Sequence, residues 1–361
     1  MSTMKAAICH AFGTPLVIEE VEIRGPKMGE VEVELDAVAI CHSDLSYQDG
    51  GFGGYLPALF GHEAAGRITA LGDGVQGFEI GDSVAVTLIR ACGHCDSCGS
   101  GSPTTCETPV DYAASPVTTK DGTPVYHAME TGAFAEKTVI HHSQIVKIPA
   151  DMPKDVACLL SCGVITGVGA AVITGGVTAG QDVVVIGAGG VGLNAIQGAR
   201  IAGARRIIAV DMHQDKLDAA KEFGATDGVL ASEPKPWNAA KKILGRGADA
   251  VLVTVGAAPV YDVAPRYLAA RGKVVMVGMP HGDKVATYSP LIMANQGQSI
   301  LGSKMGGVVV KRDIPWMVDL YQQGRLKLDE LISNRFTLEQ INEAMEDTRS
   351  GAARRNVIML R

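Results

Sequence analysis

The sequence predicts an α/β protein in two parts, a β-rich part and a parallel sheet covered by helices. Residues 31–38 alternate apolar and polar side chains with a period of two, as in a half-buried strand. Later in the chain, helical patterns separate apolar runs that lack this alternation, as in strands buried on both faces. These runs are residues 183–186, 207–210, 251–254 and 274–277. The length of 361 residues suits two domains.

The pattern of elements changes near Asp151. Before it, from residue 5 to about 149, short strands and glycine-containing turns predict a small barrel-like domain. After it, helices are predicted over 191–202 and 215–223, between the buried strands. Beyond residue 304 we expect helices near 314–323 and 338–347, then a last strand at 357–360.

The composition narrows the class of function. Apolar residues make up 47% of the chain, enough for a sizeable core. The net charge is −7 and no basic block occurs, which disfavours a nucleic-acid-binding module. The N-terminus lacks the pattern of a signal peptide, and every long apolar stretch is interrupted by charge or glycine. We therefore expect a cytoplasmic protein with reduced thiols and no membrane span.

Four cysteines, Cys92, Cys95, Cys98 and Cys106, follow one another at intervals of three, three and eight residues. A short turning loop with this spacing can bring four thiolates to one tetrahedral zinc ion. A chance cluster or a set of disulfides is the alternative, which the expected reducing compartment disfavours. The cluster alone would also suit a zinc-finger module, but the acidic charge balance weakens that interpretation.

A glycine-rich motif, Gly187 to Gly192, follows a predicted buried strand and opens a predicted helix. Its glycines allow a tight turn, a close approach of a pyrophosphate and close helix packing. Asp211 ends the next strand, where a carboxylate can accept from a ribose 2′-hydroxyl and would repel a 2′-phosphate. The motif therefore predicts that the chain binds NAD. The alternative interpretation is a glycine turn with a purely structural role, followed by an aspartate on the surface.

A second set of metal-ligating residues is spread over three segments. Cys41, His62 and Cys162 could together form an open zinc site with room for water. Each cysteine by itself could equally be a small buried apolar residue, as we expect for Cys9 and Cys158.

These motifs together resemble the zinc-dependent alcohol dehydrogenases of the medium-chain dehydrogenase/reductase superfamily. The segments Gly61-His62-Glu63, the four-cysteine lobe, the glycine motif and Cys162–Gly167 occur in the family order over nearly the whole chain. The resemblance implies a Rossmann-type doubly wound parallel sheet inserted into a β-rich, GroES-like catalytic domain. It implies a catalytic zinc-binding domain of residues 1–163 plus 304–361 and an NAD-binding domain of residues 164–303.

The resemblance also implies roles for single residues. Cys41, His62 and Cys162 would hold a catalytic zinc, and the four-cysteine lobe a structural zinc, giving two zinc ions per chain. Ser43 would relay a proton, Asp44 would orient His62, and Glu63 would be the acid that can approach the metal. The residues implied to contact NAD are His42, Thr166, Gly187, Gly189, Gly190, Val191, Gly192, Asp211, Lys216, Val255, Val277 and Arg355.

The implied reaction is the reversible NAD-dependent oxidation of primary alcohols to aldehydes, by hydride transfer from an alkoxide held at zinc. Medium-chain, allylic or aromatic alcohols are expected. The alternatives are a thiol-adduct formaldehyde dehydrogenase or a polyol dehydrogenase of the same superfamily. A non-catalytic zinc- and NAD-binding protein is disfavoured, because a pure binder needs no open zinc site. The expected partners are a small alcohol or aldehyde and further copies of the chain, as a homodimer or homotetramer, with no nucleic acid and no membrane.

Two positions depart from relatives. Ser46 stands where many relatives have a histidine that ends the proton relay, so the sequence does not identify the route by which the proton leaves. Val110 stands where the glutathione-dependent formaldehyde dehydrogenases carry an arginine for the substrate carboxylate; His127, Lys120 or another loop cation could replace it. The resemblance also places three apolar side chains around the substrate, Leu88, Phe134 and Met279.

Overall fold

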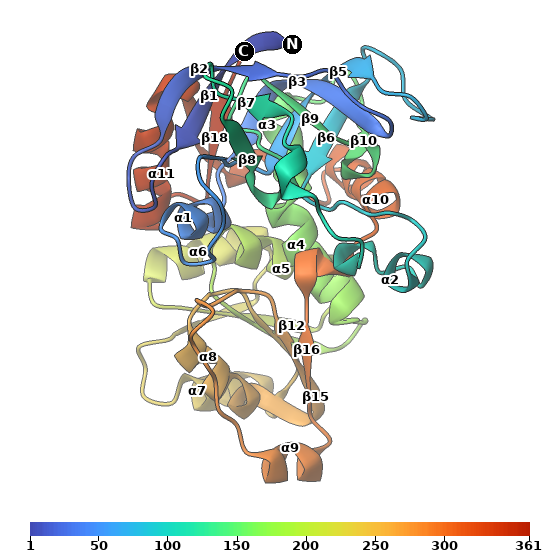
Figure 1. Cartoon of the computed structure of the whole chain (residues 1–361). Helices are drawn as coiled ribbons and strands as arrows, with labels where there is room; N and C mark the ends of the chain where they lie inside the picture. Colours follow the sequence, from blue (N-terminus) through green and yellow to red (C-terminus); the bar gives the residue numbers. More distant parts are fainter. The chain divides into compact units, whose positions relative to one another are not determined.

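The chain divides into two compact units. The computed structural model describes residues 1–361, apart from the side chain of Ala113. The first unit comprises residues 1–162 and 309–361, and the second comprises residues 163–308. Both chain termini therefore belong to the first unit, where they lie close together (Figure 1).

The first unit contains a closed barrel and a seven-stranded sheet. The barrel strands, in order, are β1 (Ser2–Cys9), β2 (Val17–Ile23), β7 (Val117–Thr118), β8 (Pro124–His127) and β4 (Ala58–Leu59). The sheet runs β10 (Ile145–Lys147), β6 (Ser83–Thr87), β5 (Glu63–Leu71), β3 (Glu30–Ala39), β18 (Arg355–Met359) and β17 (Ile332–Thr337), while β9 (Lys137–His141) also pairs with β3. In β3 the side chains alternate between half-buried and buried through Ala37, which confirms the predicted strand.

Helices of the first unit follow its strands. They are α1 (His42–Gln48), α2 (Asp96–Gly99), α3 (Lys154–Ala157), α10 (Val310–Gln322) and α11 (Ile341–Ser350). The last strand, β18, pairs antiparallel with β3. The end of the chain therefore lies next to the strand that leads into α1. One apolar core joins the barrel and this sheet, with Ile8, Leu35, Leu59, Phe60 and Phe134 among its fully buried members.

The second unit is a parallel six-stranded sheet with helices, as predicted for a Rossmann-type fold. Its strand order is β13 (Asp227–Leu230), β12 (Arg206–Asp211), β11 (Asp182–Ile186), β14 (Ala248–Val253), β15 (Leu268–Met276) and β16 (Ser299–Gly302). The helices are α4 (Gly163–Gly169), α5 (Gly190–Ile201), α6 (Gln214–Phe223), α7 (Pro236–Leu244), α8 (Ala258–Val263) and α9 (Pro290–Gln296). The strand order reverses between β11 and β14, which is where dinucleotides bind in sheets of this kind.

Two strands differ from the sequence prediction. β15 begins at Leu268, six residues before the predicted apolar run. The sequence did not predict its first half because Ala270 and Arg271 are exposed there and no continuous apolar run is present. β13 carries Asp227 and Gly228 in its short span and therefore shows no continuous apolar run. Within the described residues, no single helix is long and apolar enough to cross a membrane, and one bent pair of helices, 154–161 with 163–174, meets that test only when taken together.

Candidate functional site

Four buried side chains of the first unit converge on one point. The ligand atoms of Cys41, His62, Glu63 and Cys162 all lie within 4.8 Å of one another. Cys41 follows β3 and caps α1, while His62 and Glu63 stand at the start of β5. Because β3 and β5 pair antiparallel, with Ala39 opposite Glu63, the end of one strand meets the beginning of the other.

Asp44 holds this cluster together from α1. Its carboxylate accepts hydrogen bonds from the backbone amides of Cys41 and Gly61, both at 3.0 Å. Its Oδ1 also lies 3.2 Å from Nδ1 of His62, and both side chains are fully buried. In the neutral imidazole, a proton on Nδ1 satisfies the carboxylate and leaves the lone pair on Nε2, the atom that a metal ion can take.

The donor set fits a zinc ion. Nε2 of His62 is buried and has no hydrogen-bond partner among the described residues, which is costly unless something else fills that role. A hydrogen bond from Cys162, with help from His62, lowers the pKa of the Cys41 thiol well below its ordinary value. Two sulfurs and one imidazole nitrogen are ligands that zinc prefers.

Charged and polar groups surround the cluster. Glu63 and Arg355 form an ion pair in which both side chains are buried. Burial raises the pKa of Glu63 to about 7, against the opposite effect of Arg355. Ser43 is the second residue of α1, and its Oγ lies 3.7 Å from Sγ of Cys41. A hydroxyl therefore stands beside the candidate metal ligands, and its role as a proton relay stays a prediction.

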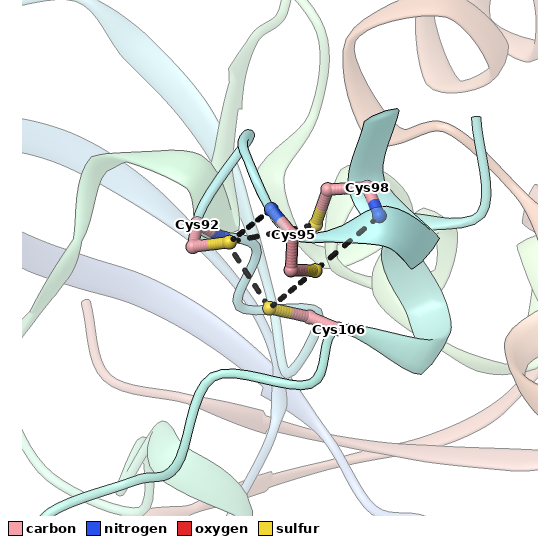
Figure 2. Close-up of side chains that lie close together, drawn as sticks. All are labelled: Cys92, Cys95, Cys98 and Cys106. Carbon is pink, nitrogen blue, oxygen red and sulfur yellow. Dashed lines mark hydrogen bonds between the residues drawn. The ribbon is translucent and has the colours of Figure 1, made fainter. Parts of the chain in front are cut away.

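The four-cysteine lobe forms a second cluster, shown in Figure 2. Sγ of Cys92 lies 4.0 Å from Sγ of Cys98, and Sγ of Cys95 lies 4.0 Å from Sγ of Cys106. A tetrahedral ion with metal–sulfur distances of ~2.3 Å would set sulfurs about 3.8 Å apart, whereas a disulfide needs about 2.05 Å. The spacing therefore fits a metal centre.

Backbone amides donate hydrogen bonds to the sulfurs of this lobe. Sγ of Cys92 accepts from the amides of His94 at 3.4 Å and Cys95 at 3.2 Å. Sγ of Cys95 accepts from Cys98 at 3.4 Å, and Sγ of Cys106 accepts from Cys92 at 3.4 Å. A hydrogen bond from Thr108, together with these amides, lowers the pKa of Cys92 to about 5. The loop thus favours a thiolate at Cys92 and Cys106, whereas burial raises the pKa of the Cys98 thiol.

The glycine motif of the second unit connects β11 to α5. Gly187 has a φ of +96°, and a Cβ there would lie 2.4 Å from Cγ1 of Val255. A Cβ on Gly192 would lie 1.8 Å from the carbonyl oxygen of Gly187. By contrast, nothing lies within 4 Å of the Cβ position of Gly189, the residue that caps α5. The loop therefore leaves open space at the helix N-terminus, which fits a pyrophosphate.

Known proteins resemble this chain over nearly its whole length. Residues 27–150 match the family model for the alcohol dehydrogenase GroES-like domain, and residues 190–323 match that for the zinc-binding dehydrogenase. An NDMA-dependent alcohol dehydrogenase from Amycolatopsis methanolica is 36% identical over 98% of each chain. The chain belongs to the zinc-binding alcohol dehydrogenase family.

Solved structures place this alcohol dehydrogenase in the same fold. A zinc-binding alcohol dehydrogenase domain protein from Burkholderia ambifaria is 33% identical, with a TM-score of 0.96 over 100% of this chain and 99% of that one. Benzyl alcohol dehydrogenase from Acinetobacter calcoaceticus is 31% identical, with a TM-score of 0.94 over the full length of both chains. The fold and the general activity thus rest on relatives that span the whole enzyme.

The remaining candidate cofactor residues of the dehydrogenase lie in both units. In the second unit, Thr166 is buried in α4 and Lys216 is half-exposed in α6. Gly190 begins α5, and the half-buried Val191 follows it. Two further half-buried valines lie just after the carboxyl ends of strands, Val255 after β14 and Val277 after β15. In the first unit, His42 is the exposed first residue of α1, and Arg355 is buried beside Glu63. Asp211 is half-buried at the end of β12.

The three apolar residues expected near the substrate differ in burial. Phe134 is fully buried in the core, and its ring and amide pack against Gly61, so it supports the His62 turn from below. Leu88 is half-buried at the end of β6 and Met279 is exposed. The sequence did not predict roles for Thr108, which hydrogen-bonds to Cys92 of the four-cysteine lobe, or for Thr254, which hydrogen-bonds to the glycine motif. For Thr254 the available signal was its position directly after a buried apolar strand.

Proposed function

We propose that this alcohol dehydrogenase oxidises primary alcohols to aldehydes with NAD, and that Cys41, His62 and Cys162 hold the catalytic zinc. The observation that carries the proposal is the buried Nε2 of His62, which has no hydrogen-bond partner among the described residues and lies between two thiols. Cys92, Cys95, Cys98 and Cys106 would hold a structural zinc.

Bound zinc would supply the Lewis acidity that lowers the pKa of an alcohol hydroxyl, and bound NAD would accept the hydride. The chain's own residues then prepare and move the proton. Asp44 keeps the proton of His62 on Nδ1 and fixes the ring. Ser43 would receive the hydroxyl proton and donate its own to the ribose hydroxyl of bound NAD, because a serine hydroxyl exchanges a proton without retaining it. The contact of Arg355 with a pyrophosphate stays a prediction, since its guanidinium is paired with Glu63.

The choice of NAD over NADP rests on Asp211. Its carboxylate ends β12 beside the glycine motif, where a 2′-phosphate would meet a negative charge. Replacing the side chain with Asp211→Gly should raise kcat/KM for NADP relative to NAD. A wild-type enzyme that used both cofactors equally would contradict this role.

An apolar alcohol is the proposed substrate. A thiol-adduct substrate brings carboxylates, which need a paired cation in a desolvated site. Burial lowers the pKa of His127 to about 4, so this imidazole is neutral at pH 7. Lys120 forms a salt bridge with Glu20 in which both side chains are half-exposed or more. A neutral, buried His127 and a Lys120 already paired with Glu20 are poor substitutes for the arginine that relatives carry at the position of Val110, which supports medium-chain, allylic or aromatic alcohols over thiol adducts.

The test is the formation of NADH, followed by its absorbance, with ethanol, hexanol, benzyl alcohol, a polyol and S-hydroxymethylglutathione. We expect benzyl alcohol and hexanol to give higher kcat/KM than ethanol, and the glutathione adduct to be a poor substrate. A clear preference for the adduct or for the polyol would overturn the substrate assignment while leaving the dehydrogenase chemistry in place.

We also propose that a second copy of the chain pairs with the outer edge of β16. This strand has β15 on one side, so its other edge can extend the sheet across a two-fold axis. Nearby, Leu291 and Val285 are 79% and 82% exposed, more than an isolated surface usually shows for large apolar residues. Leu291→Lys should shift the mass measured by light scattering towards the monomer. Met28→Lys, at an equally exposed residue of the first unit, is the control and should leave the mass unchanged.

A further inference from the structure

One peptide group of the glycine motif is held at both ends by side chains. The carbonyl oxygen of Gly187 accepts a hydrogen bond from Oγ1 of Thr254 at 2.9 Å. The amide of Ala188, which belongs to the same peptide group, donates to Oδ2 of Asp211 at 2.8 Å. Thr254 directly follows β14 and Asp211 ends β12, so the two residues approach the loop from the strands on either side of β11.

This peptide group would otherwise be easy to rotate. Glycine adopts positive and negative φ at similar cost, and Gly187 lies at φ +96°. Its own amide donates to the carbonyl of Val210 at 2.8 Å, which fixes only the near side of the residue. A flip of this peptide group would turn its carbonyl oxygen towards the carboxylate of Asp211 and would lose both hydrogen bonds. The backbone of Gly189 and Gly190, which follows this peptide, would then lose the fixed direction in which the first turn of α5 offers its amides to an anion.

We propose that Thr254 is a positioning residue for the dinucleotide: with Asp211, it fixes the Gly187–Ala188 peptide so that the start of α5 presents amides to the pyrophosphate. Oγ1 of Thr254 also donates to the carbonyl of Ile186 at 3.0 Å, so one hydroxyl serves two successive carbonyls at the end of β11. The same oxygen lies 3.0 Å from the Cβ position of Gly192, which places it beneath the first turn of α5.

The proposal gives Asp211 two tasks. Its Oδ2 holds the loop, while its charge faces the ribose position and opposes a 2′-phosphate. Its Oδ1 accepts from the amide of His213 at 3.2 Å, so the carboxylate is fixed from both sides. Thr254 shares the first task and has no part in the second. A change at Thr254 should therefore weaken NADH and NADPH binding by the same factor, whereas a change at Asp211 should alter their ratio.

This inference rests on the proposed use of NAD, and it is tested with a pair of variants that differ by one hydroxyl. Thr254→Ser keeps Oγ and Thr254→Ala removes it, in the zinc-loaded enzyme. Loss of a positioned hydrogen bond should raise the Kd for NADH, measured by fluorescence titration, about 5- to 10-fold in Thr254→Ala. Thr254→Ser should stay within about twofold of wild type. KM for NAD should rise in Thr254→Ala with a smaller effect on kcat at saturating cofactor.

A matched control comes from Thr226, whose Oγ1 donates to the carbonyl of Ile207 at 3.2 Å at the opposite ends of the strands. Thr226→Ala removes a comparable hydrogen bond and should leave the Kd for NADH unchanged. Equal Kd values for Thr254→Ser and Thr254→Ala would overturn the proposal. A wild-type enzyme that bound no dinucleotide would instead overturn the proposed function. Because Ser and Ala are compared with each other, a loss of stability common to both leaves the comparison intact.

Discussion

Oδ1 of Asp44 lies 3.2 Å from Nδ1 of His62, and both side chains are completely buried. The carboxylate also accepts hydrogen bonds from the backbone amides of Cys41 and Gly61. It therefore joins the backbone of one candidate zinc ligand, Cys41, to the side chain of another, His62. The geometry of the site therefore depends on a residue that offers nothing to the metal itself.

Asp44→Asn should weaken the catalytic zinc. An amide in this position can donate to Nδ1, which moves the proton of His62 to Nε2 and removes the lone pair. Loss of such a supporting partner typically costs 10- to 100-fold in metal affinity or activity. Competition with a chelator measures the zinc affinity, and kcat/KM with benzyl alcohol measures the activity. Asp82→Asn, at a surface carboxylate that accepts from the amide of Glu79 at 2.7 Å, is the control; equal losses in both variants would contradict the role of Asp44.

Ser43→Ala should slow the reaction while zinc content stays normal. The hydroxyl beside Cys41 is proposed to move the alcohol proton, and loss of a positioned proton transfer costs on the order of 100-fold in kcat. Ser46→Ala makes the same change three residues later on α1 and should stay within about twofold of wild type. Full activity in Ser43→Ala would exclude this relay.

The two metal sites should respond differently to single ligand changes. Cys106→Ser breaks the lobe in which four sulfurs lie on one loop, so we expect the loss of one zinc per chain and a lower melting temperature. Cys41→Ser should abolish activity with less effect on melting, because β3, β5 and α1 are also held by their own hydrogen bonds. Elemental analysis and thermal unfolding are the measurements, with Cys9→Ser as the control at a buried cysteine outside both clusters. Equal melting defects in the two ligand variants would refute the division into structural and catalytic sites.

The sequence predicted the two-part fold and the two clusters of candidate metal ligands that the structure brings together. Cysteine and histidine ligands depend on residue type and spacing, and the buried parallel strands showed as continuous apolar runs. Thr254 was missed because its partners, Ile186 and Gly187, lie 68 and 67 positions away and become neighbours only when β11 and β14 pair.

Phe134 shows what the family order leaves open. The resemblance predicts that it lies near the substrate, which stays a prediction, whereas the direction of its side chain depends on the backbone pairing of residues 133–134 with 60–61. That pairing turns the ring into the core, beneath Gly61. Spacing along a chain predicts which residues share a loop, whereas the side to which each one points depends on non-local packing.

Gly61→Ala should destabilise the enzyme more than an ordinary glycine substitution. Gly61 has a φ of +88°, and a Cβ there would lie 2.7 Å from both the amide nitrogen and the ring of Phe134. Gly77, at φ +79° with nothing within 4 Å, is the matched control for backbone strain alone. We expect a loss of about 1 kcal/mol in the free energy of unfolding for Gly77→Ala and at least twice that for Gly61→Ala. Urea unfolding measures both, and equal values would show that Phe134 moves aside without cost.

Acid should destabilise the first unit partly through His127. Burial lowers the pKa of this imidazole from 6.5 to about 4, so the folded chain keeps it neutral where the unfolded chain protonates it. The unfolded state then binds more protons between pH 6.5 and 4, so the free energy of unfolding falls as the pH falls through this range. The contribution is about 2 kcal/mol between pH 7 and pH 5. His127→Gln removes it, so the difference between wild type and variant in urea unfolding should shift by that amount in favour of the variant at pH 5. The pKa of His141 is likewise lowered to about 4, chiefly by burial, and adds the same slope to both proteins. A difference that stayed constant from pH 7 to pH 5 would show that His127 is protonated in the folded enzyme.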